Sequence, residues 1–296
     1  MWRVREILVR RYRWIWCLWK DQRGLLLRRQ VSLNKRKAIM KIDKIYLGDC
    51  LELMKEIPDK SIDCIICDLP YEVLNKNNVN AQWDKVIPFE HLWPQYERIV
   101  KDNAAIILFG QGMFTAKTMV SNPKLWRYNL IWQKGGRCSG FLNAKKMPLR
   151  EHEDIMVFYR QQPPYNPQMT KCQPHERNHS RGKLNTEQTN RCYGNFGKAD
   201  DIITNLKYPK SILNFKRPHP QVHPTQKPVE LIRYLIRTYT NVGGVILDNC
   251  IGSGTTAIAA IRENRHFIGM ELNKEYYEIA LKRIKEENRQ LKFQFD

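Results

Sequence analysis

Short apolar runs alternate along most of the chain with segments that have the 3.6-residue periodicity of helices. Runs such as Ile62–Cys67 are rich in β-branched residues and lack a polar face, which is typical of strands buried on both sides. Strands are expected at residues 41–47, 62–67, 104–109, 125–133, 154–159, 245–247 and 266–270, and helices at residues 50–56, 89–100, 113–120, 228–239, 257–263 and 274–288. The alternation predicts an α/β protein with a doubly wound, Rossmann-like parallel sheet of about seven strands.

Two segments break this alternation. In residues 161–222 Pro, Asn, Gln, Lys and Arg dominate, which predicts a loop-rich basic insertion. Residues 1–39 mix Trp, Arg and aliphatic residues, without the ~20 apolar residues that span a bilayer or the apolar region of a signal peptide. We interpret residues 1–39 as an appended extension, non-native or disordered, ahead of globular sequence that begins near Met40. The alternative is a basic amphipathic anchor, and full activity of a chain that starts at Met40 would favour the first interpretation.

The charge of the chain narrows its partners. The 50 Lys and Arg residues exceed the 30 Asp and Glu residues, which gives a net charge of +20. Residues 1–39 hold twelve Lys and Arg and two Asp and Glu, so half of this excess lies there and +10 remains for the body. A polyanion such as nucleic acid is a natural partner for a basic body, although a solvated basic surface has the same composition.

The eight cysteines show no extracellular framework, and several lie in apolar runs, which indicates reduced thiols in a cytoplasmic protein. Cys64 and Cys67 form a CxxC pair within an expected strand. Because their spacing is odd, their side chains should point to opposite faces of the sheet and make a poor metal site.

One glycine-rich turn has the pattern of a nucleoside site. The strand at 245–247 ends in Asp248, and Gly252-Ser253-Gly254-Thr255-Thr256 leads into the next helix. Glycines let a ligand approach the backbone closely, and a helix N-terminus offers free N–H groups. About twenty residues further on a strand ends in Glu271, where a carboxylate can accept both hydroxyls of a ribose. The alternative is a tight turn with a purely structural role.

Asp68-Leu69-Pro70-Tyr71 follows the strand at 62–67 directly. An exocyclic amine such as adenine N6 is a poor nucleophile because its lone pair is delocalised into the ring. The Asp68 carboxylate and the Leu69 carbonyl can accept its two protons and localise that lone pair for attack on a methylsulfonium. Pro70 stiffens the turn, and Tyr71 can stack on a base that has flipped out of the duplex. By itself the motif is equally compatible with an ordinary strand-to-loop turn.

Together these segments resemble one family. Asp68–Tyr71 is similar to the DPPY motif of the amino-methyltransferases of DNA, Asp248–Thr256 to their cofactor loop, and His223–Pro228 to the HPTQKP segment that precedes that loop. Gly48-Asp49-Cys50 resembles the end of the family's opening strand. The catalytic motif comes first and the cofactor loop last, which is the permuted order of the β group of N6-adenine and N4-cytosine methyltransferases.

The resemblance implies a seven-stranded, circularly permuted methyltransferase fold and a division of the chain. Residues 40–134 would be the catalytic half, residues 135–222 the target-recognition insertion with a core strand near 154–159, and residues 223–296 the cofactor-binding half. It also implies S-adenosylmethionine as cofactor, double-stranded DNA as substrate, a place in restriction-modification or phage biology and a possible homodimer. Asp68 rather than serine favours N6 of adenine within the family.

The family's residue roles carry over as expectations. Asp248, Gly252, Gly254 and Thr255 would line the methionine end of the cofactor. Glu271 would hold its ribose, Asp49 would lie near its adenine edge, and Thr225 and Lys227 would close over it. Two departures stand out, since Leu69 replaces the first proline of DPPY and Cys250 stands where the family often has phenylalanine. Leu69 keeps the carbonyl that the chemistry needs, and Cys250 should affect packing more than reactivity.

Other chemistries remain as alternatives. N4-cytosine methylation, the same reaction on RNA, and an inactive nucleic-acid-binding protein with a methylase-like fold all fit the motifs. Cytosine-C5 methylation is disfavoured because no cysteine follows a proline. Cys172, His175, His179 and Cys192 have spacing that could bind zinc, although they could instead belong to a DNA-facing loop with Arg177, Arg181, Tyr193 and Phe196. No metal is therefore expected in the catalytic site.

Overall fold

The computed structural model describes residues 14–20, 26–32, 40–72, 84–136, 138–171, 205–219 and 225–295. The chain divides into two compact units, Met1–Ile39 and Met40–Asp296. In the first unit β1 (Trp14–Lys20) pairs antiparallel with β2 (Leu26–Ser32). The sequence pattern did not predict this hairpin.

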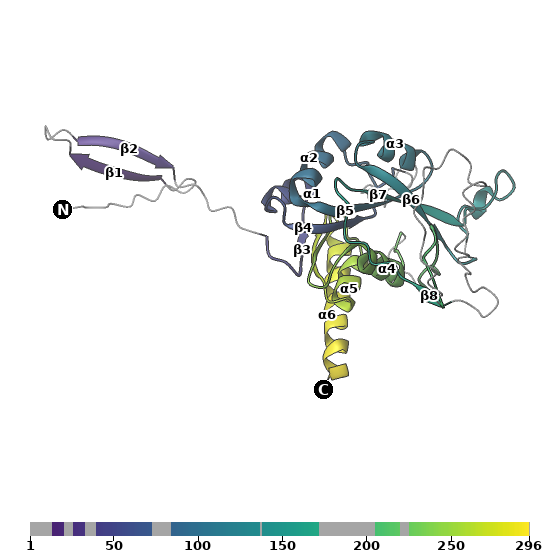
Figure 1. Cartoon of the computed structure of the whole chain (residues 1–296). Coiled ribbons are helices and arrows are strands. Elements are labelled where there is room, and N and C mark those ends of the chain that lie inside the picture. The colour runs from purple at the N-terminus through teal and green to yellow at the C-terminus, as the bar shows by residue number, and fades with distance from the viewer. Residues whose placement is uncertain are drawn as a thin grey trace, which may run out of the picture. The chain divides into compact units, whose positions relative to one another are not determined.

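The second unit is built on one large sheet (Figure 1). Its strands are β3 (Lys44–Leu47), β4 (Ile62–Cys67), β5 (Val100–Gly110), β6 (Trp126–Gln133), β7 (His152–Phe158), β10 (Ile212–Asn214), β11 (Val245–Asp248) and β12 (His266–Glu271). They lie in the order β10-β6-β7-β5-β4-β11-β12-β3. A separate pair consists of β8 (Thr170–Lys171) and β9 (Leu206–Lys207). The helices are α1 (Cys50–Leu53), η1 (Met54–Glu56), α2 (Phe89–Ile99), α3 (Met113–Ser121), η4 (Phe141–Asn143), α4 (Val229–Tyr239), α5 (Thr255–Arg262) and α6 (Lys274–Phe295).

The predicted α/β class is confirmed, and every expected strand and helix of residues 40–296 has a counterpart within a few residues. The expectation of an all-parallel sheet was wrong, because β7 runs antiparallel to both β5 and β6. In its described residues the segment between β6 and β7 contains one short helix, η4, and a hairpin connection without a crossover helix makes its two strands antiparallel. The eighth strand is β10, which returns from the loop-rich insertion and pairs parallel with β6.

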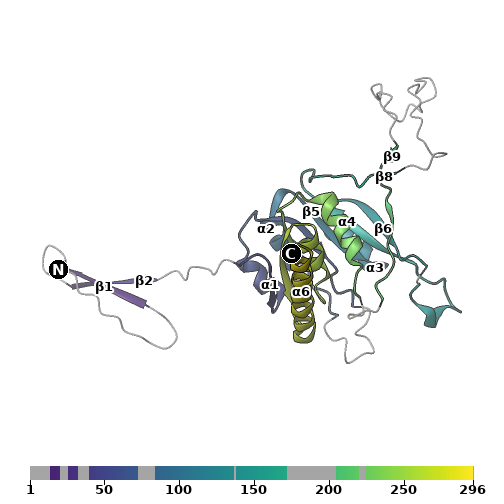
Figure 2. The same ribbon diagram turned by 90° about the horizontal axis from the view of Figure 1, so that it is seen from below.

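Helices cover both faces of the sheet. Side chains of α1, η1, α2 and α3 belong to one buried apolar cluster, and side chains of α4, α5 and α6 belong to another on the opposite face. Figures 1 and 2 show these two groups of helices around the sheet. Cys67 lies in the first cluster and Cys64 in the second, as their odd spacing predicted. No helix in the described ranges is long and apolar enough to cross a membrane.

Several expectations fall outside the described residues. These are the candidate zinc ligands Cys172, His175, His179 and Cys192, their neighbours Arg177, Arg181, Tyr193 and Phe196, and the first two residues of His223–Pro228. Within the residues that are described, no group of three or more His, Cys, Asp and Glu is arranged to hold a metal ion.

Candidate functional site

A cavity of about 570 Å³ opens at the carboxyl ends of the central strands β4 and β11. These strands are parallel neighbours, with Ile246 opposite Cys64. The sheet continues to β5 beyond β4 and to β12 beyond β11, so the cavity lies where the strand order reverses. Ligands of open α/β sheets bind in this position. All predicted site residues except Gly254 line the cavity, namely Asp49, Asp68, Leu69, Pro70, Tyr71, Thr225, Lys227, Asp248, Gly252, Thr255 and Glu271.

One part of the cavity, which we call the glycine-loop end, is formed by Asp49, Asp248, Gly252, Thr255 and Glu271. Asp248 is the last residue of β11 and is buried. Its carboxylate accepts hydrogen bonds from Thr256 Oγ1 at 2.6 Å and from the Cys250 N–H at 3.1 Å. Burial nevertheless raises the pKa of Asp248 to about 7, because these two bonds only partly replace lost water. An ammonium group bound here would stabilise the charged form of the Asp248 carboxylate.

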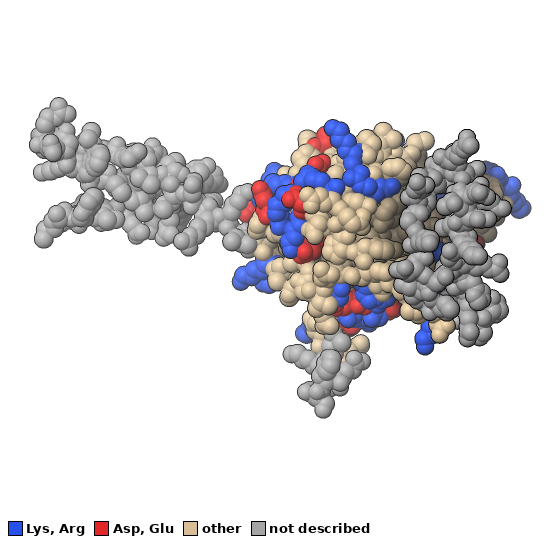
Figure 3. Space-filling model, in the orientation of Figure 1, with Lys and Arg blue, Asp and Glu red and all other residues tan. Residues whose placement is uncertain are grey.

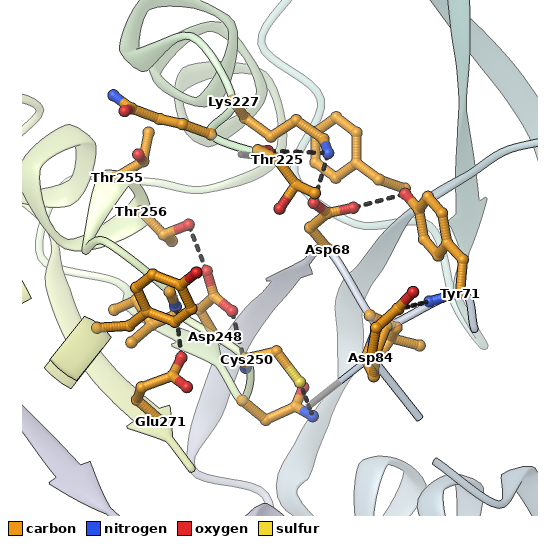
Figure 4. A pocket seen from close by; sticks show the side chains of 18 of the residues that line it. Asp68, Tyr71, Asp84, Thr225, Lys227, Asp248, Cys250, Thr255, Thr256 and Glu271 are labelled. Atoms are coloured by element: carbon orange, nitrogen blue, oxygen red, sulfur yellow. Dashed lines mark hydrogen bonds and ion pairs between the residues drawn. The ribbon is translucent and has the colours of Figure 1, made fainter. Parts of the chain in front are cut away.

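Glu271 ties the glycine loop to the next strand. Its two carboxylate oxygens accept the backbone N–H groups of Gly252 and Asn273, each at 2.8 Å. Burial raises the pKa of Glu271. On the other side of this end Asp49 caps α1 by accepting the Leu51 N–H at 2.7 Å. Figure 4 shows Asp248, Cys250, Thr256 and Glu271 grouped on this side of the cavity.

The two glycines of the loop have different positions. Gly252 lines the cavity and has φ +53°, a conformation that favours glycine. Gly254 does not line the cavity, and its expected contact with the cofactor stays a prediction. It has φ +84°, and a Cβ at this position would lie 3.0 Å from Ala280 Cβ. Gly254 therefore permits close packing of the loop against α6.

The other part of the cavity, which we call the ion-pair end, is formed by Asp68, Lys134, Glu153 and Lys227. Asp68 Oδ2 accepts from Lys227 Nζ at 2.5 Å, and Asp68 Oδ1 accepts from the Tyr71 hydroxyl at 2.5 Å. Burial raises the pKa of Asp68, and the adjacent ammonium of Lys227 opposes the rise. Burial alone would lower the pKa of Lys227, but Asp68 and Glu153 outweigh it and raise that pKa. Lys227 is therefore an ammonium held against the predicted catalytic carboxylate.

Lys227 has its closest contacts at the ion-pair end. Its Nζ lies between Asp68 and Glu153 and 5.1 Å from the centre of the Phe109 ring, while the expected contact with the cofactor stays a prediction. Thr225 lines the same cavity, and its carbonyl oxygen is 3.4 Å from Lys227 Nζ. Figure 4 shows Lys227 directed at Asp68 rather than at the group around Asp248.

Sequence reasoning missed Glu153 and Lys134. Glu153 Oε1 pairs with Lys134 Nζ at 2.8 Å, and Glu153 Oε2 lies 3.2 Å from Lys227 Nζ without a hydrogen bond of good geometry. Burial would raise the pKa of Glu153, but the two lysines outweigh burial and lower it. The result is a chain of alternating charges, Asp68–Lys227–Glu153–Lys134, in which both lysines are buried and both carboxylates are half-buried. Glu153 lies near the start of β7, and nothing in the neighbouring sequence indicates that it pairs with two lysines.

Asp84 was missed as well. It is buried, and its Oδ1 accepts the backbone N–H groups of Tyr71 at 2.8 Å and Glu72 at 3.0 Å. Glu72 has φ +60°, which is unfavourable for a residue with a side chain. The Tyr71 ring packs on Phe114 with 4.6 Å between ring centres. Asp84 therefore fixes the turn after Pro70 and the position of Tyr71.

The chemistry of the glycine-loop end fits S-adenosylmethionine. Three carboxylates, Asp49, Asp248 and Glu271, line one end of the cavity and match the ammonium and the hydroxyl groups of that molecule. The backbone at Gly252 has no side chain between it and the cavity. Among the described residues neither Asp248 nor Glu271 has a cationic partner, so this end has a surplus of acceptors there, whereas the carboxylates of the ion-pair end are paired with lysines.

Solved structures define the class of the fold. The M1.HpyAVI–SAM complex matches with a TM-score of 0.55 and 22% identity over 81% of this chain and 98% of that chain. The PvuII DNA methyltransferase (cytosine-N4-specific) matches with a TM-score of 0.57 and 16% identity over 80% of this chain and 84% of that chain. At such identities the likeness concerns the fold alone, which is the Rossmann-like methyltransferase fold.

The sequence defines the family. The model of the N6/N4 methyltransferase family, described as DNA methylase, matches residues 62–282. Type II methyltransferase M2.MboI of Moraxella bovis is 28% identical over 278 residues, which cover 85% of this chain and 90% of M2.MboI. The chain therefore belongs to the N6-adenine/N4-cytosine DNA methyltransferase family, whose cofactor is S-adenosylmethionine.

Proposed function

We propose that this DNA methyltransferase transfers a methyl group from S-adenosylmethionine to N6 of adenine in double-stranded DNA, after the base has flipped out of the duplex. The observation that carries this proposal is the state of Asp68. Its carboxylate lines the cavity, is only partly exposed and already binds an N–H donor, the Lys227 ammonium, at 2.5 Å. An exocyclic amine is also an N–H donor, although neutral, and would take the place of that ammonium.

The residues would divide the work as follows. Asp68 and the carbonyl of Leu69 would accept hydrogen bonds from the two N–H groups of the exocyclic amine, which localises its lone pair. As the methyl group is transferred, S-adenosylhomocysteine would be left and the nitrogen would lose one proton to the solvent. Tyr71, held by Asp84 and Phe114, provides a ring beside the base. Removal of water from the cavity strengthens these hydrogen bonds, and positioning supplies most of the remaining rate enhancement. When bound, S-adenosylmethionine supplies an electrophilic methyl group.

The cofactor would occupy the glycine-loop end. Asp248 would face its ammonium, Glu271 its ribose and Asp49 the edge of its adenine, with Gly252 and Thr255 along the methionine part. Thr225 lines the cavity between the two ends and remains a candidate to cover the cofactor. We assign Lys227 to the target base rather than to the cofactor, because its ammonium is held by Asp68 and Glu153.

The second candidate is methylation of N4 of cytosine, because the fold matches a methyltransferase that is cytosine-N4-specific. The same acceptors at Asp68 and Leu69 would serve that amine. The deciding experiment is incubation of unmodified duplex DNA and RNA with methyl-labelled S-adenosylmethionine, followed by digestion and identification of the labelled nucleoside. N6-methyladenine from DNA is expected. Labelled N4-methylcytosine would replace the proposal, and cofactor binding without transfer to any substrate would favour an inactive methylase-like protein.

Base-resolution mapping of methylation in cells that express the protein would then give the recognition sequence. The proposal predicts one short sequence context with a modified adenine. The same DNA, purified from cells without the protein, is the control.

A further inference from the structure

The connection between β6 and β7 presents an exposed apolar tip. Phe141 and Leu142 are 77% and 84% exposed, and Met147 and Leu149 are 55% and 43% exposed. Leu142 is the most exposed large apolar residue in the part of the chain that the structure describes. Side chains of this type lose favourable burial when they face water, so four of them within nine residues indicate a surface that contacts a partner.

The tip is a formed structure with its own backbone hydrogen bonds. Ser139 and Arg150 pair through two bonds of 2.8 and 3.0 Å at its base. Gly140, at φ +87°, begins the single turn of η4, in which the N–H groups of Asn143 and Ala144 donate to the carbonyls of Gly140 and Phe141. In Figures 1 and 2 this segment, which lies beyond the end of β6, projects away from the sheet. The apolar side chains are therefore held out from the body by a defined turn.

The base of the tip is joined to the ion-pair end of the cavity. Ser139 lines the cavity, and its hydroxyl lies 3.3 Å from Lys134 Nζ. Lys134 in turn pairs with Glu153, which contacts the lysine on Asp68. The tip thus rises from the side of the cavity where the target base is proposed to enter, opposite the glycine loop.

The charge of the tip identifies the partner. Between Ser139 and Arg150 there are two lysines, Lys145 and Lys146, and no acidic residue. These two lysines and Arg150 are exposed. Figure 3 shows blue atoms at this edge of the molecule. Basic residues match phosphates, whereas the apolar pair Phe141 and Leu142 matches the faces of stacked bases.

We infer that residues 140–149 bind duplex DNA at the target site, and that Phe141 and Leu142 enter the base stack where the target base leaves it. Lys145, Lys146 and Arg150 contact the flanking phosphates. Filling the gap in the stack lowers the cost of holding the base in the cavity. This inference rests on the proposed function, since a flipped base is what creates the gap.

The test compares duplex and single-stranded DNA, because a single strand has no stack to fill. Phe141→Ala/Leu142→Ala is expected to lower kcat/KM on native genomic DNA by about tenfold or more, and to leave the rate on the same DNA after heat denaturation unchanged. Val242→Ala is the matched control, since Val242 is 73% exposed and lies in the turn before β11, away from the carboxyl ends of the strands. Equal loss on both substrates, or loss on neither, would overturn the inference.

A second measurement does not depend on activity toward single strands. In the mapped recognition duplex the target adenine is replaced by 2-aminopurine, whose fluorescence rises when it leaves the stack. The wild-type protein should produce this rise, and Phe141→Ala/Leu142→Ala should bind the duplex without it. An equal rise in both proteins contradicts insertion of the two side chains.

The basic residues have a separate readout. Lys145→Ala/Lys146→Ala should reduce the slope of log binding constant against log salt by about 1 for each lysine, with the fluorescence rise retained at low salt. Unchanged salt dependence would place these lysines away from the phosphates. Methyl transfer by the wild-type protein tests the proposed function, whereas only the variants test the role of the tip. A failure of the proposed function can therefore be distinguished from a failure of this inference.

Discussion

The two ends of the cavity hold their carboxylates in different ways. At the glycine-loop end the carboxylates accept bonds from backbone N–H groups close in sequence or on the adjoining loop, as Asp49 does from Leu51 and Asp248 from Cys250. At the ion-pair end Asp68 is held by Lys227, which lies 159 residues further along the chain. One end is fixed by local backbone geometry, and the other is assembled from distant charged side chains.

This difference has a functional meaning. Asp248 and Glu271 are held by backbone N–H groups and, at Asp248, by the nearby Thr256 hydroxyl, so the acceptors of the glycine-loop end are fixed in place. The partners of Asp68 are side chains, and Lys227 can leave it because Glu153 is already 3.2 Å away. Under the proposed function, the substrate amine would replace this internal cation on Asp68. The variants below act on one end while the other end serves as the internal reference.

The largest effect is expected from Asp68→Ala. Methyl transfer should fall by about 100- to 1,000-fold or more, because the amine loses its principal acceptor. Affinity for S-adenosylmethionine should stay nearly intact, since no glycine-loop residue is touched. The measurements are single-turnover transfer and calorimetric binding of the cofactor. Asp59→Asn is a control at an exposed ion pair with Arg98, and wild-type transfer in Asp68→Ala would refute the role of Asp68.

A smaller loss is expected from Glu153→Gln. Without the second carboxylate Lys227 remains bound to Asp68 and competes with the target amine. We therefore expect methyl transfer to fall by about tenfold, which corresponds to about 1.4 kcal/mol for the lost ion pair between Lys227 and Glu153. The apparent KM for DNA should rise while cofactor affinity is unchanged. Glu153→Asp keeps the charge and should recover most of the activity. If the role of Glu153 were purely structural, the melting temperature of both variants would fall as well. Unchanged KM and rate in Glu153→Gln would remove Glu153 from the mechanism.

The affinity of the glycine-loop end for the cofactor should depend on pH. Because the pKa of Asp248 is raised from 3.8 to about 7, the carboxyl is protonated below about pH 7 and charged above it. Cofactor affinity should therefore rise with pH, changing by about tenfold per unit below 7 and levelling off above it. In Asp248→Asn this dependence should disappear, leaving only the cofactor's own titration. A wild-type profile identical to that of the variant would exclude contact between Asp248 and the ammonium.

The stability of the cofactor-free protein should change in the opposite direction. A carboxyl whose pKa is higher in the folded state favours folding most at pH values below its unfolded pKa of 3.8, and this contribution is lost as the pH rises to about 7. Asp248→Asn should remove that part of the pH dependence of the free energy of unfolding. Denaturant unfolding at several pH values between about 5 and 8 measures the free energy of unfolding below and above the pKa of Asp248.

The same difference between the two ends decides what could be predicted from sequence. Asp248, Gly252 and Glu271 follow strand ends in a local pattern, and Asp68 follows β4 directly, so residue type and spacing placed all four at the cavity. Lys134 and Glu153 come together only because β6 and β7 are antiparallel neighbours, in which Gln133 lies opposite His152. A pattern that favoured an all-parallel sheet could not place that pair.

The contacts of Lys227 were equally out of reach of the sequence pattern. Motif order placed this residue near the cofactor loop, which it precedes in the chain, but buried charges are positioned by their partners rather than by sequence proximity. Asp84 likewise acts on Tyr71 from the far side of residues 73–83, so no local pattern connects the two. The eighth strand was missed because Ile212–Asn214 is only three residues long and lies in a polar segment.

The smallest effect on function is expected at Gly254, which separates packing from ligand contact within the loop. Gly254→Ala combines φ +84° with a Cβ 3.0 Å from Ala280, whereas Gly243→Ala combines φ +78° with open space. The left-handed conformation alone should cost about 1–2 kcal/mol in Gly243→Ala, and Gly254→Ala should cost more because α6 must also shift. The difference in free energy of unfolding between the two variants, measured by urea denaturation, isolates the contact with Ala280. Cofactor affinity should be the same in both folded variants, since Gly254 does not line the cavity. A selective loss of cofactor binding in Gly254→Ala would instead restore Gly254 to the cofactor site and show that the loop moves when the ligand binds.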